Sequence, residues 1–319
     1  MSAVIETKNL KKYFSVPGGV LHAVDDVSIS IERGKTIGVV GESGCGKSTL
    51  GLCLVHLHES TDGQIFLNGE DVTDLNKRQL RKFREKAQIV FQDPYSSLNP
   101  RMTVDEIIRE PLILSRRYKK GELDDRVDEL MELTGIEERL AQSYPHELDG
   151  GCRQRIGIAR ALSLDPEFIV CDEPVSALDV SIQAQILNLL MDIQEKSSLT
   201  LMFVTHDLSV VRHISNSICV MYLGQVVEMS PTEELFLNQL HPYTKALMSA
   251  VPSIDIHNPS QRVMLSGELT SPINPKPGCR FKDRCVYATT ACEEPQTLEE
   301  ITPGHLCLCS RVNEINQLV

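Results

Sequence analysis

The sequence predicts an α/β fold built around a parallel sheet. Three short apolar runs without polar alternation are typical of strands buried on both faces: Thr36–Val40, Phe168–Cys171 and Leu201–Thr205. Between the second and third runs, apolar residues recur at helical spacing; they are Ile182, Ile186, Leu189, Leu190 and Ile193. Strand, crossover helix and strand together form the repeating unit of a parallel sheet.

The first strand leads into a glycine-rich loop and then a helix. Residues Gly41–Ser48 match the pattern G-x-x-x-x-G-K-[ST] in full, and Leu50–Leu57 can continue as helix. In this pattern backbone N–H groups surround phosphates, Lys47 can reach the β- and γ-phosphates, and the Ser48 hydroxyl is placed for Mg²⁺. We therefore predict a nucleoside-triphosphate site made by Gly41, Glu42, Ser43, Gly44, Cys45, Gly46, Lys47, Ser48 and Thr49.

Two carboxylates follow the second strand. Asp172 and Glu173 would be costly in a core and useful beside Mg²⁺. We expect Asp172 to support the metal shell and Glu173 to orient or deprotonate an attacking water. A surface turn is the alternative interpretation, but the glycine-rich loop earlier in the chain favours the catalytic one.

The rest of the chain divides by its patterning. Residues 93–165 are predicted to form an inserted helical subdomain, with helices over Val104–Glu110, Gly121–Thr134 and Gln154–Leu162. After residue 230, prolines exclude long helices and central strands; they include Pro231, Pro242, Pro252, Pro259, Pro272, Pro275 and Pro277. We expect one domain over residues 1–230 and a separate Pro- and Cys-rich region over residues 231–319.

Charge and hydropathy exclude several classes of protein. In 319 residues, 44 acidic side chains against 32 basic ones give a net charge of −12, so the surface as a whole repels nucleic acid and anionic lipid. The basic run Arg78–Arg84 is expected to be a solvated helix face. The longest apolar stretches, such as Ile218–Leu223, are far shorter than the ~20 residues of a membrane helix, and Met1–Leu10 has no signal-peptide core. We therefore expect a cytoplasmic protein.

With these residues, the sequence resembles the ATP-binding subunits of ABC transporters over residues 1–230. The resemblance implies a P-loop NTPase core with a parallel sheet, an antiparallel β element and an inserted helical subdomain. It implies that Gln92 contacts Mg²⁺ and faces the membrane subunits, that Asp179 belongs to the D-loop, and that His206 is the switch histidine at the γ-phosphate. The adenine-stacking ring is Tyr13 or its neighbour Phe14, and we favour Phe14.

Finer matches resemble the oligopeptide/dipeptide (and nickel) importers, and most closely the second of their two paired ATPases. The matching segments are Gln92–Pro100, Glu173–Gln185 and His241–Thr244. Such importers combine two membrane permeases, two ATPases and an extracytoplasmic binding protein. The resemblance implies a peripheral subunit at the cytoplasmic face of the membrane that never touches the peptide.

The chain departs from the family at its signature motif. Leu148-Asp149-Gly150-Gly151-Cys152 stands where the family has L-S-G-G-Q. The resemblance implies that Asp149, Gly150 and Gly151 cover the γ-phosphate bound by a second subunit. An ionised Asp149 only accepts hydrogen bonds and repels a phosphate, so we expect one impaired composite site. A homodimer would carry this defect twice, which favours a heterodimer.

Five of the ten cysteines lie between Cys279 and Cys309. In a reducing compartment disulfides are not expected, and the spacing lacks C-x-x-C pairs, so spacing alone leaves iron–sulfur, zinc and free thiols open. Gly278–Cys285 with Gly304-His305 resembles a C-terminal module of these importers, which implies a [4Fe–4S] cluster. Its implied ligands are Cys279, Cys285, Cys292 and Cys309, with Cys307 as competitor for the fourth position. The apolar surroundings of the other cysteines predict small core residues at Cys45, Cys53, Cys171 and Cys219.

Two other functions fit parts of the sequence. Asp149 would suit a regulatory nucleotide-binding subunit without useful turnover, but the intact Glu173 and His206 favour hydrolysis. A non-transport ABC protein acting on nucleic acid or ribosomes is the second alternative, and the acidic charge argues against it.

Overall fold

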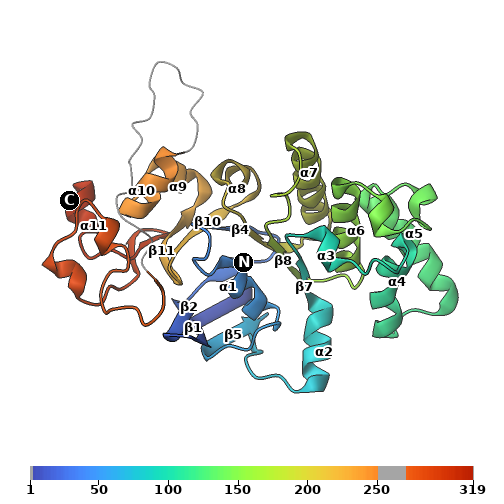
Figure 1. Ribbon diagram of the computed structural model, residues 1–319, viewed down its shortest axis with the longest axis horizontal. Coiled ribbons are helices and arrows are strands. Elements are labelled where there is room, and N and C mark those ends of the chain that lie inside the picture. Colours follow the sequence, from blue (N-terminus) through green and yellow to red (C-terminus); the bar gives the residue numbers. More distant parts are fainter. Residues whose placement is uncertain (1–2, 251–270, 319) are drawn as a thin grey trace, which may run out of the picture. The chain divides into compact units, whose positions relative to one another are not determined.

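The computed structural model describes residues 3–250 and 271–318 (Figure 1). Pro252 and Pro259 lie outside the described residues. The chain forms two compact units. The first unit comprises Met1–Ile5, Ile31–Lys35 and Leu67–Val204, and the second comprises Glu6–Ser30, Thr36–Phe66 and Thr205–Val319.

The second unit contains the predicted phosphate loop and a mixed sheet. Strand β4 (Thr36–Val40) is buried throughout and pairs in parallel with β10 (Ser217–Tyr222). Strand β11 (Gln225–Pro231) is antiparallel to β10. Helix α1 (Lys47–Leu54) follows the loop, and α8 (Leu208–Ile214) contacts β4. The predicted order of strand, glycine-rich loop and helix is therefore confirmed, although α1 ends three residues earlier than expected.

The predicted antiparallel element is also present. Strand β1 (Ala3–Val16) pairs antiparallel with β2 (Gly19–Val27), and β5 (Asp62–Leu67) lies on the other side of β1. The short strand β3 (Ser30–Glu32) pairs with β1 as well. The side chain of Thr7 on β1 also joins this strand to the end of β2, because its hydroxyl donates to the Val27 carbonyl at 3.0 Å.

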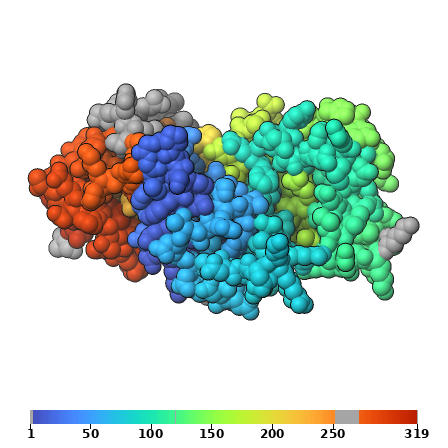
Figure 2. All heavy atoms as spheres, turned by 60° about the horizontal axis from the view of Figure 1, so that its bottom comes forward, coloured from blue at the N-terminus to red at the C-terminus, as the bar shows by residue number. Residues whose placement is uncertain are grey.

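The C-terminal residues extend the sheet of the second unit. Strand β13 (His305–Cys307) pairs with β11, and β12 (Glu299–Thr302) pairs with β13. Helices α9 (Thr232–Leu237), α10 (Pro242–Ser249) and α11 (Val312–Asn316) complete the region, with single 3₁₀ turns at Lys282–Arg284 and Thr290–Glu293. Figure 2 shows these orange and red residues against the dark-blue N-terminal strands, where the His22 N–H donates to the Pro272 carbonyl at 3.0 Å. The sequence had not indicated these contacts.

The first unit holds a parallel sheet and the predicted helices. Its strand order is β7 (Ala87–Val90), β8 (Phe168–Asp172) and β9 (Thr200–Val204), with α7 (Val180–Ser197) as the expected crossover. Helices α3 (Pro94–Ser97), α4 (Val104–Ser115), α5 (Lys120–Thr134) and α6 (Gly150–Leu162) occupy the predicted helical segment, with 3₁₀ turns at Glu138–Leu140 and Pro145–Glu147. A capping box of Thr103 and Glu106 begins α4.

The basic run lies on α2 (Lys77–Lys86), which follows the two-residue strand β6 (Glu70–Asp71). Asn76 and Gln79 form a capping box at its start, and Phe83 is its one buried residue. The run is therefore a solvated helix face, as expected. In the part of the chain that the structure describes, no helix combines the length and apolarity needed to cross a membrane.

Candidate nucleotide-binding and catalytic site

The phosphate loop requires glycine at two positions. Gly41 and Gly46 adopt φ angles of 152° and 105°, in the region that side chains disfavour. A Cβ atom on Gly41 would lie 2.2 Å from the Met221 carbonyl oxygen, and one on Gly46 would lie 2.0 Å from that of Ala23. Only glycine lets the loop pass this close to the neighbouring backbone.

Lys47 lies inside the curve of this loop. Its ammonium donates to the carbonyls of Gly41 at 2.8 Å and of Glu42 at 3.1 Å, and the side chain is buried. Ser43, Gly44 and Ser48 are exposed. Since α1 begins at Lys47, the N–H groups of its first turn and its dipole favour an anion at the loop.

His206 belongs to the same unit as the loop. The Thr205 N–H donates to the carbonyl of Val39 at 3.2 Å, which holds the residue before His206 beside the end of β4. His206 itself is exposed, and Asp207 caps α8 by accepting from the Ser209 N–H at 2.8 Å. The sequence-predicted switch histidine thus follows the strand edge from which the phosphate loop departs.

The two candidate adenine-stacking rings have different surroundings. Tyr13 stacks on His22 with ring centroids 4.0 Å apart, and its hydroxyl donates to the Asp25 carboxylate. Burial and this hydrogen bond raise the pKa of Tyr13. Phe14 makes an edge contact with His58, with ring centroids 5.5 Å apart, and a cation–π contact with the Lys12 ammonium, which lies 4.8 Å from the ring centroid. Because Tyr13 is held in a polar network, these contacts favour Phe14 as the stacking ring.

In the first unit, the structure brings Gln92 and Glu173 together. The Gln92 amide donates to the Glu173 carboxylate at 3.0 Å and lies 3.5 Å from the Ser176 hydroxyl. Asp172 is buried at the end of β8, whereas Glu173 is partly exposed with a left-handed φ of 46°. Non-glycine residues adopt this conformation in only a few per cent of cases. The hydrogen bond from Gln92 fixes the carboxylate of Glu173 beside the end of β8.

Asp149 has a local role that the sequence analysis missed. It is the N-cap of α6, and its carboxylate accepts from the Cys152 N–H at 2.7 Å. Aspartate before a helical pattern is a recognised start signal, so the sequence could have indicated this. The charge argument is unaffected, because Asp149 is exposed.

The two glycines of the signature pack against the segment that holds Asp179. A Cβ atom on Gly151 would lie 2.7 Å from the Ile182 side chain, and one on Gly150 would lie 3.2 Å from that of Leu178. Asp179 is exposed at the start of α7. The signature and the D-loop are therefore one packed assembly within the first unit.

The C-terminal cysteines are free thiols, as are the other five. Three thiols act electrostatically on Cys279, so they lie near it; they are Cys285, Cys292 and Cys309. Cys292 also acts on Cys285 and on Cys309. Burial, together with these neighbours, raises the pKa of Cys279 to about 11. Among residues 3–250 and 271–318, however, no group of three or more His, Cys, Asp or Glu side chains is arranged to hold a metal ion.

Cys307 is close to this group, because Cys309 and Cys279 act on it electrostatically. It is buried with Leu240 and Val312, and burial followed by the charge of Glu228 raises its pKa. As expected, the cysteines of the apolar segments are core residues; Cys45, Cys53, Cys171 and Cys219 are all buried. The fifth cysteine outside the C-terminal region, Cys152, is half-buried beside Asp149.

Comparisons with known proteins identify the family of the chain. Residues 24–176 match the ABC transporter family, and residues 227–292 match the C-terminal region of oligopeptide/dipeptide transporters. The oligopeptide transport ATP-binding protein AppF of Bacillus subtilis is 48% identical over 317 residues, which cover 96% of each chain. The dipeptide transport ATP-binding protein DppF of Haemophilus influenzae is 48% identical over 311 residues, or 95% of each chain.

A solved structure extends the comparison to the fold. It is a dimeric ATP-binding cassette in a post-hydrolysis state bound to ADP and Pi, with a TM-score of 0.66 and 31% identity. The match covers 72% of this chain and 98% of that one. Together these likenesses show that the chain belongs to the ABC transporter ATPases of the oligopeptide/dipeptide importer family, in the group of the AppF- and DppF-like second ATPases.

Proposed function

We propose that this chain binds MgATP and hydrolyses it to power the import of oligopeptides or dipeptides. The observation that carries the proposal is the hydrogen bond between Gln92 and Glu173, in a chain that also keeps the complete phosphate loop and His206. A subunit that only sensed nucleotide would have no need of a positioned carboxylate. Its relatives AppF and DppF are transport ATP-binding proteins for oligopeptides and dipeptides.

Each site residue has a defined part in this proposal. Lys47 and the loop N–H groups hold the β- and γ-phosphates, and Phe14, or else Tyr13, stacks on adenine. Ser48, Gln92 and Asp172 would hold Mg²⁺, which neutralises charge on the phosphates when bound. Their oxygen donors suit that ion, since Asp172 presents a carboxylate at the end of a buried strand. Glu173 orients the attacking water, and His206 donates to the γ-phosphate.

The assembly we propose is a heterodimer with a second ATPase, docked on two permeases at the cytoplasmic face of the membrane. An extracytoplasmic binding protein delivers the peptide, so the solute is chosen outside this chain. In the heterodimer, the signature residues Asp149, Gly150 and Gly151, with Asp179, face the nucleotide held by the partner. The charge of Asp149 supports unequal sites, because a carboxylate there opposes a phosphate.

For the C-terminal region, residues 231–319, we propose a [4Fe–4S] cluster held by Cys279, Cys285, Cys292 and Cys309. Three observations support it: the thiols lie near one another, they are not oxidised to disulfides, and the Arg311 guanidinium acts on Cys292 and Cys309. A neighbouring cation favours thiolates, which are the usual ligands of such clusters. Cys307 is buried in the apolar cluster with Leu240 and Val312, whereas Cys309 packs against this cluster and is only half-buried, which favours Cys309 as the fourth ligand. A bound cluster would stabilise the fold of a region that has little core of its own.

The assembly is tested by purifying the tagged chain from detergent-solubilised membranes and identifying its partners. We expect two permeases and a second ATPase, and ATP hydrolysis that rises when peptide-loaded binding protein is added to the reconstituted complex. Recovery of ribosomal proteins or nucleic acid instead of permeases would refute the transport proposal. A complex that binds ATP and transports peptide without hydrolysis at the Lys47 site would support the regulatory alternative.

A further inference from the structure

A buried arginine of the C-terminal region forms an ion pair with the phosphate loop. Arg284 ends the 3₁₀ turn Lys282–Arg284, and its two terminal nitrogens donate to the two carboxylate oxygens of Glu42 at 2.8 and 2.9 Å. Arg284 is 8% exposed, and the side chain of Glu42 is 23% exposed. A two-point pair of this kind fixes direction as well as distance. Glu42 is the second residue of the loop.

The backbone of Glu42 is held from outside the loop as well. Its N–H donates to the hydroxyl of Tyr243 at 2.9 Å. The Tyr243 ring packs on Tyr222 and Phe281, with centroids 4.7 and 5.4 Å away. Arg284 also donates to the Tyr222 hydroxyl, at 3.4 Å. The side chain of Glu42 is thus held by Arg284, and its backbone by Tyr243 of the aromatic cluster.

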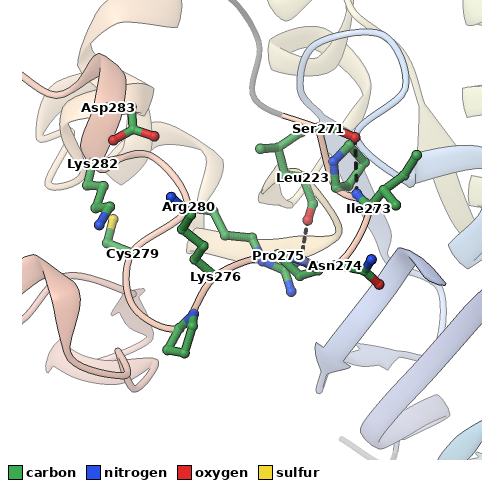
Figure 3. Close-up of a pocket in the computed structure, with 12 residues that line it drawn as sticks. Leu223, Ser271, Ile273, Asn274, Pro275, Lys276, Cys279, Arg280, Lys282 and Asp283 are labelled. Atoms are coloured by element: carbon green, nitrogen blue, oxygen red, sulfur yellow. Dashed lines mark hydrogen bonds between the residues drawn. The ribbon is translucent and has the colours of Figure 1, made fainter. Parts of the chain in front are cut away.

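A second arginine of the same short segment holds strand β2, which contains Asp25. Arg280 donates to the Asp25 carboxylate and to the Leu223 carbonyl, and Figure 3 shows its side chain reaching toward Leu223 along a cavity of about 260 Å³. Asp25 also accepts from Tyr13, beside Phe14 on β1. Residues 280–284 therefore contact both the phosphate loop and the network next to the proposed adenine ring.

The charge of Glu42 explains why the pairing matters. A free carboxylate in the second position of a phosphate loop repels the triphosphate that the loop must bind. Arg284 neutralises it. The Glu42 carbonyl, meanwhile, accepts from Lys47 at 3.1 Å, so a displaced Glu42 also changes the surroundings of the phosphate-binding ammonium.

We propose that Arg284 is a positioning residue for ATP: through Glu42 it holds and neutralises the phosphate loop, so that nucleotide affinity depends on the C-terminal region. The proposal rests on the proposed function, because it assigns a role in ATP binding. It makes the region from residue 279 onward part of the nucleotide site rather than an appendage. Arg280 supports the same arrangement through Asp25.

The test is the affinity of the purified full chain for a fluorescent ATP analogue with Mg²⁺. Arg284→Gln should raise Kd about tenfold, since it removes the charge-assisted pair. Adding Glu42→Gln to Arg284→Gln should restore most of the affinity, because the uncompensated charge is gone. In the assembled transporter, KM for ATP should rise while kcat changes less than twofold. Lys282→Gln, on the same turn but facing Glu293 at 3.7 Å, is the matched control and should bind like the wild type.

The outcomes separate this inference from the proposed function. A wild-type chain that does not bind the analogue refutes the proposed function. A folded Arg284→Gln chain with wild-type affinity, or a double variant that binds no better than the single one, refutes the positioning role alone. If Arg284→Gln does not fold, Arg284→Lys serves instead: it keeps the charge but loses the two-point geometry, so Kd should rise by less than tenfold, and an unchanged Kd would refute the positioning role.

Discussion

The side-chain amide of Gln92 donates a 3.0 Å hydrogen bond to the carboxylate of Glu173, 81 residues further along the chain. Strands β7 and β8 are parallel neighbours, with Val90 opposite Cys171, so the residues that follow them emerge at one edge of the sheet. Glu173 itself has a left-handed backbone conformation, with a φ of 46°. Gln92 is exposed, so a partner that moves its loop would also change the hydrogen bond to Glu173.

Replacing Glu173 by Gln should stop hydrolysis and keep ATP binding. The amide can still hydrogen-bond to water but cannot take its proton, and loss of a general base typically lowers turnover at least ~100-fold. In the heterodimer this variant should accumulate the ATP-bound dimer, seen as an earlier elution volume in size-exclusion chromatography. Gln92→Glu is a useful comparison, since it places a second carboxylate against an intact Glu173. Wild-type turnover by Glu173→Gln would remove Glu173 from the proposed mechanism.

The sequence predicted those parts of the site whose signal is local. The phosphate loop and the buried strands are each encoded within ten residues, as are the carboxylates after β8. The pairing of Arg284 with Glu42 spans 242 residues and has no local pattern, so it could be found only in the fold. The strands β12 and β13 were missed for a similar reason. They are four and three residues long; β13 is held by its pairing with β11, and β12 by its pairing with β13, so neither is set by its own sequence.

His241 should make stability depend on pH. Burial lowers its pKa to about 4, although the charge of Glu228 opposes this, and its neutral Nδ1 accepts from the Tyr243 N–H at 3.1 Å. Above pH 6.5 the residue is neutral in both folded and unfolded chains. Between pH 6.5 and 4 only the unfolded chain gains the proton, so the free energy of unfolding should fall by roughly 3 kcal/mol.

Denaturant unfolding of His241→Asn checks this effect. Asparagine is also a good N-cap, so the variant should keep the start of α10 and lose the titration. The difference in unfolding free energy between wild type and variant should therefore shrink as the pH falls from 7 to 4. Parallel curves for the two proteins would mean that His241 does not titrate in this range.

The cysteine proposal predicts a spectroscopic signal. Protein purified without oxygen should contain iron and labile sulfide and absorb broadly near ~400 nm, as [4Fe–4S] proteins do. Cys279→Ser or Cys285→Ser should abolish the absorbance. Cys307→Ala is the control, because this thiol is buried with Leu240 and Val312, and it should leave the iron content unchanged. One zinc and no iron per chain would favour the zinc alternative. Loss of iron in Cys307→Ala would show that Cys307, in place of Cys309, is the fourth ligand.

The last prediction concerns the unequal sites of the heterodimer. Because Asp149 caps α6, a test of its charge must keep the cap, and both Asp149→Ser and Asp149→Asn do so. Each should raise hydrolysis at the site whose phosphate loop belongs to the partner and leave the Lys47 site nearly unchanged. Asp149→Ala, which loses both charge and cap, separates the two roles, since it should raise hydrolysis at that site only if α6 keeps its start.

Mutating the phosphate-loop lysines one at a time distinguishes the two sites. Lys47→Ala should nearly abolish ATPase activity, because it disables the site that is completed by a normal signature from the partner. The corresponding lysine-to-alanine change in the partner should leave much of the activity, because it disables the site that Asp149 already weakens. The charge argument requires this order, and Asp149→Ser should then reduce the difference between the two lysine variants. Equal losses from both, with no gain from Asp149→Ser, would show that the carboxylate does not oppose the phosphate.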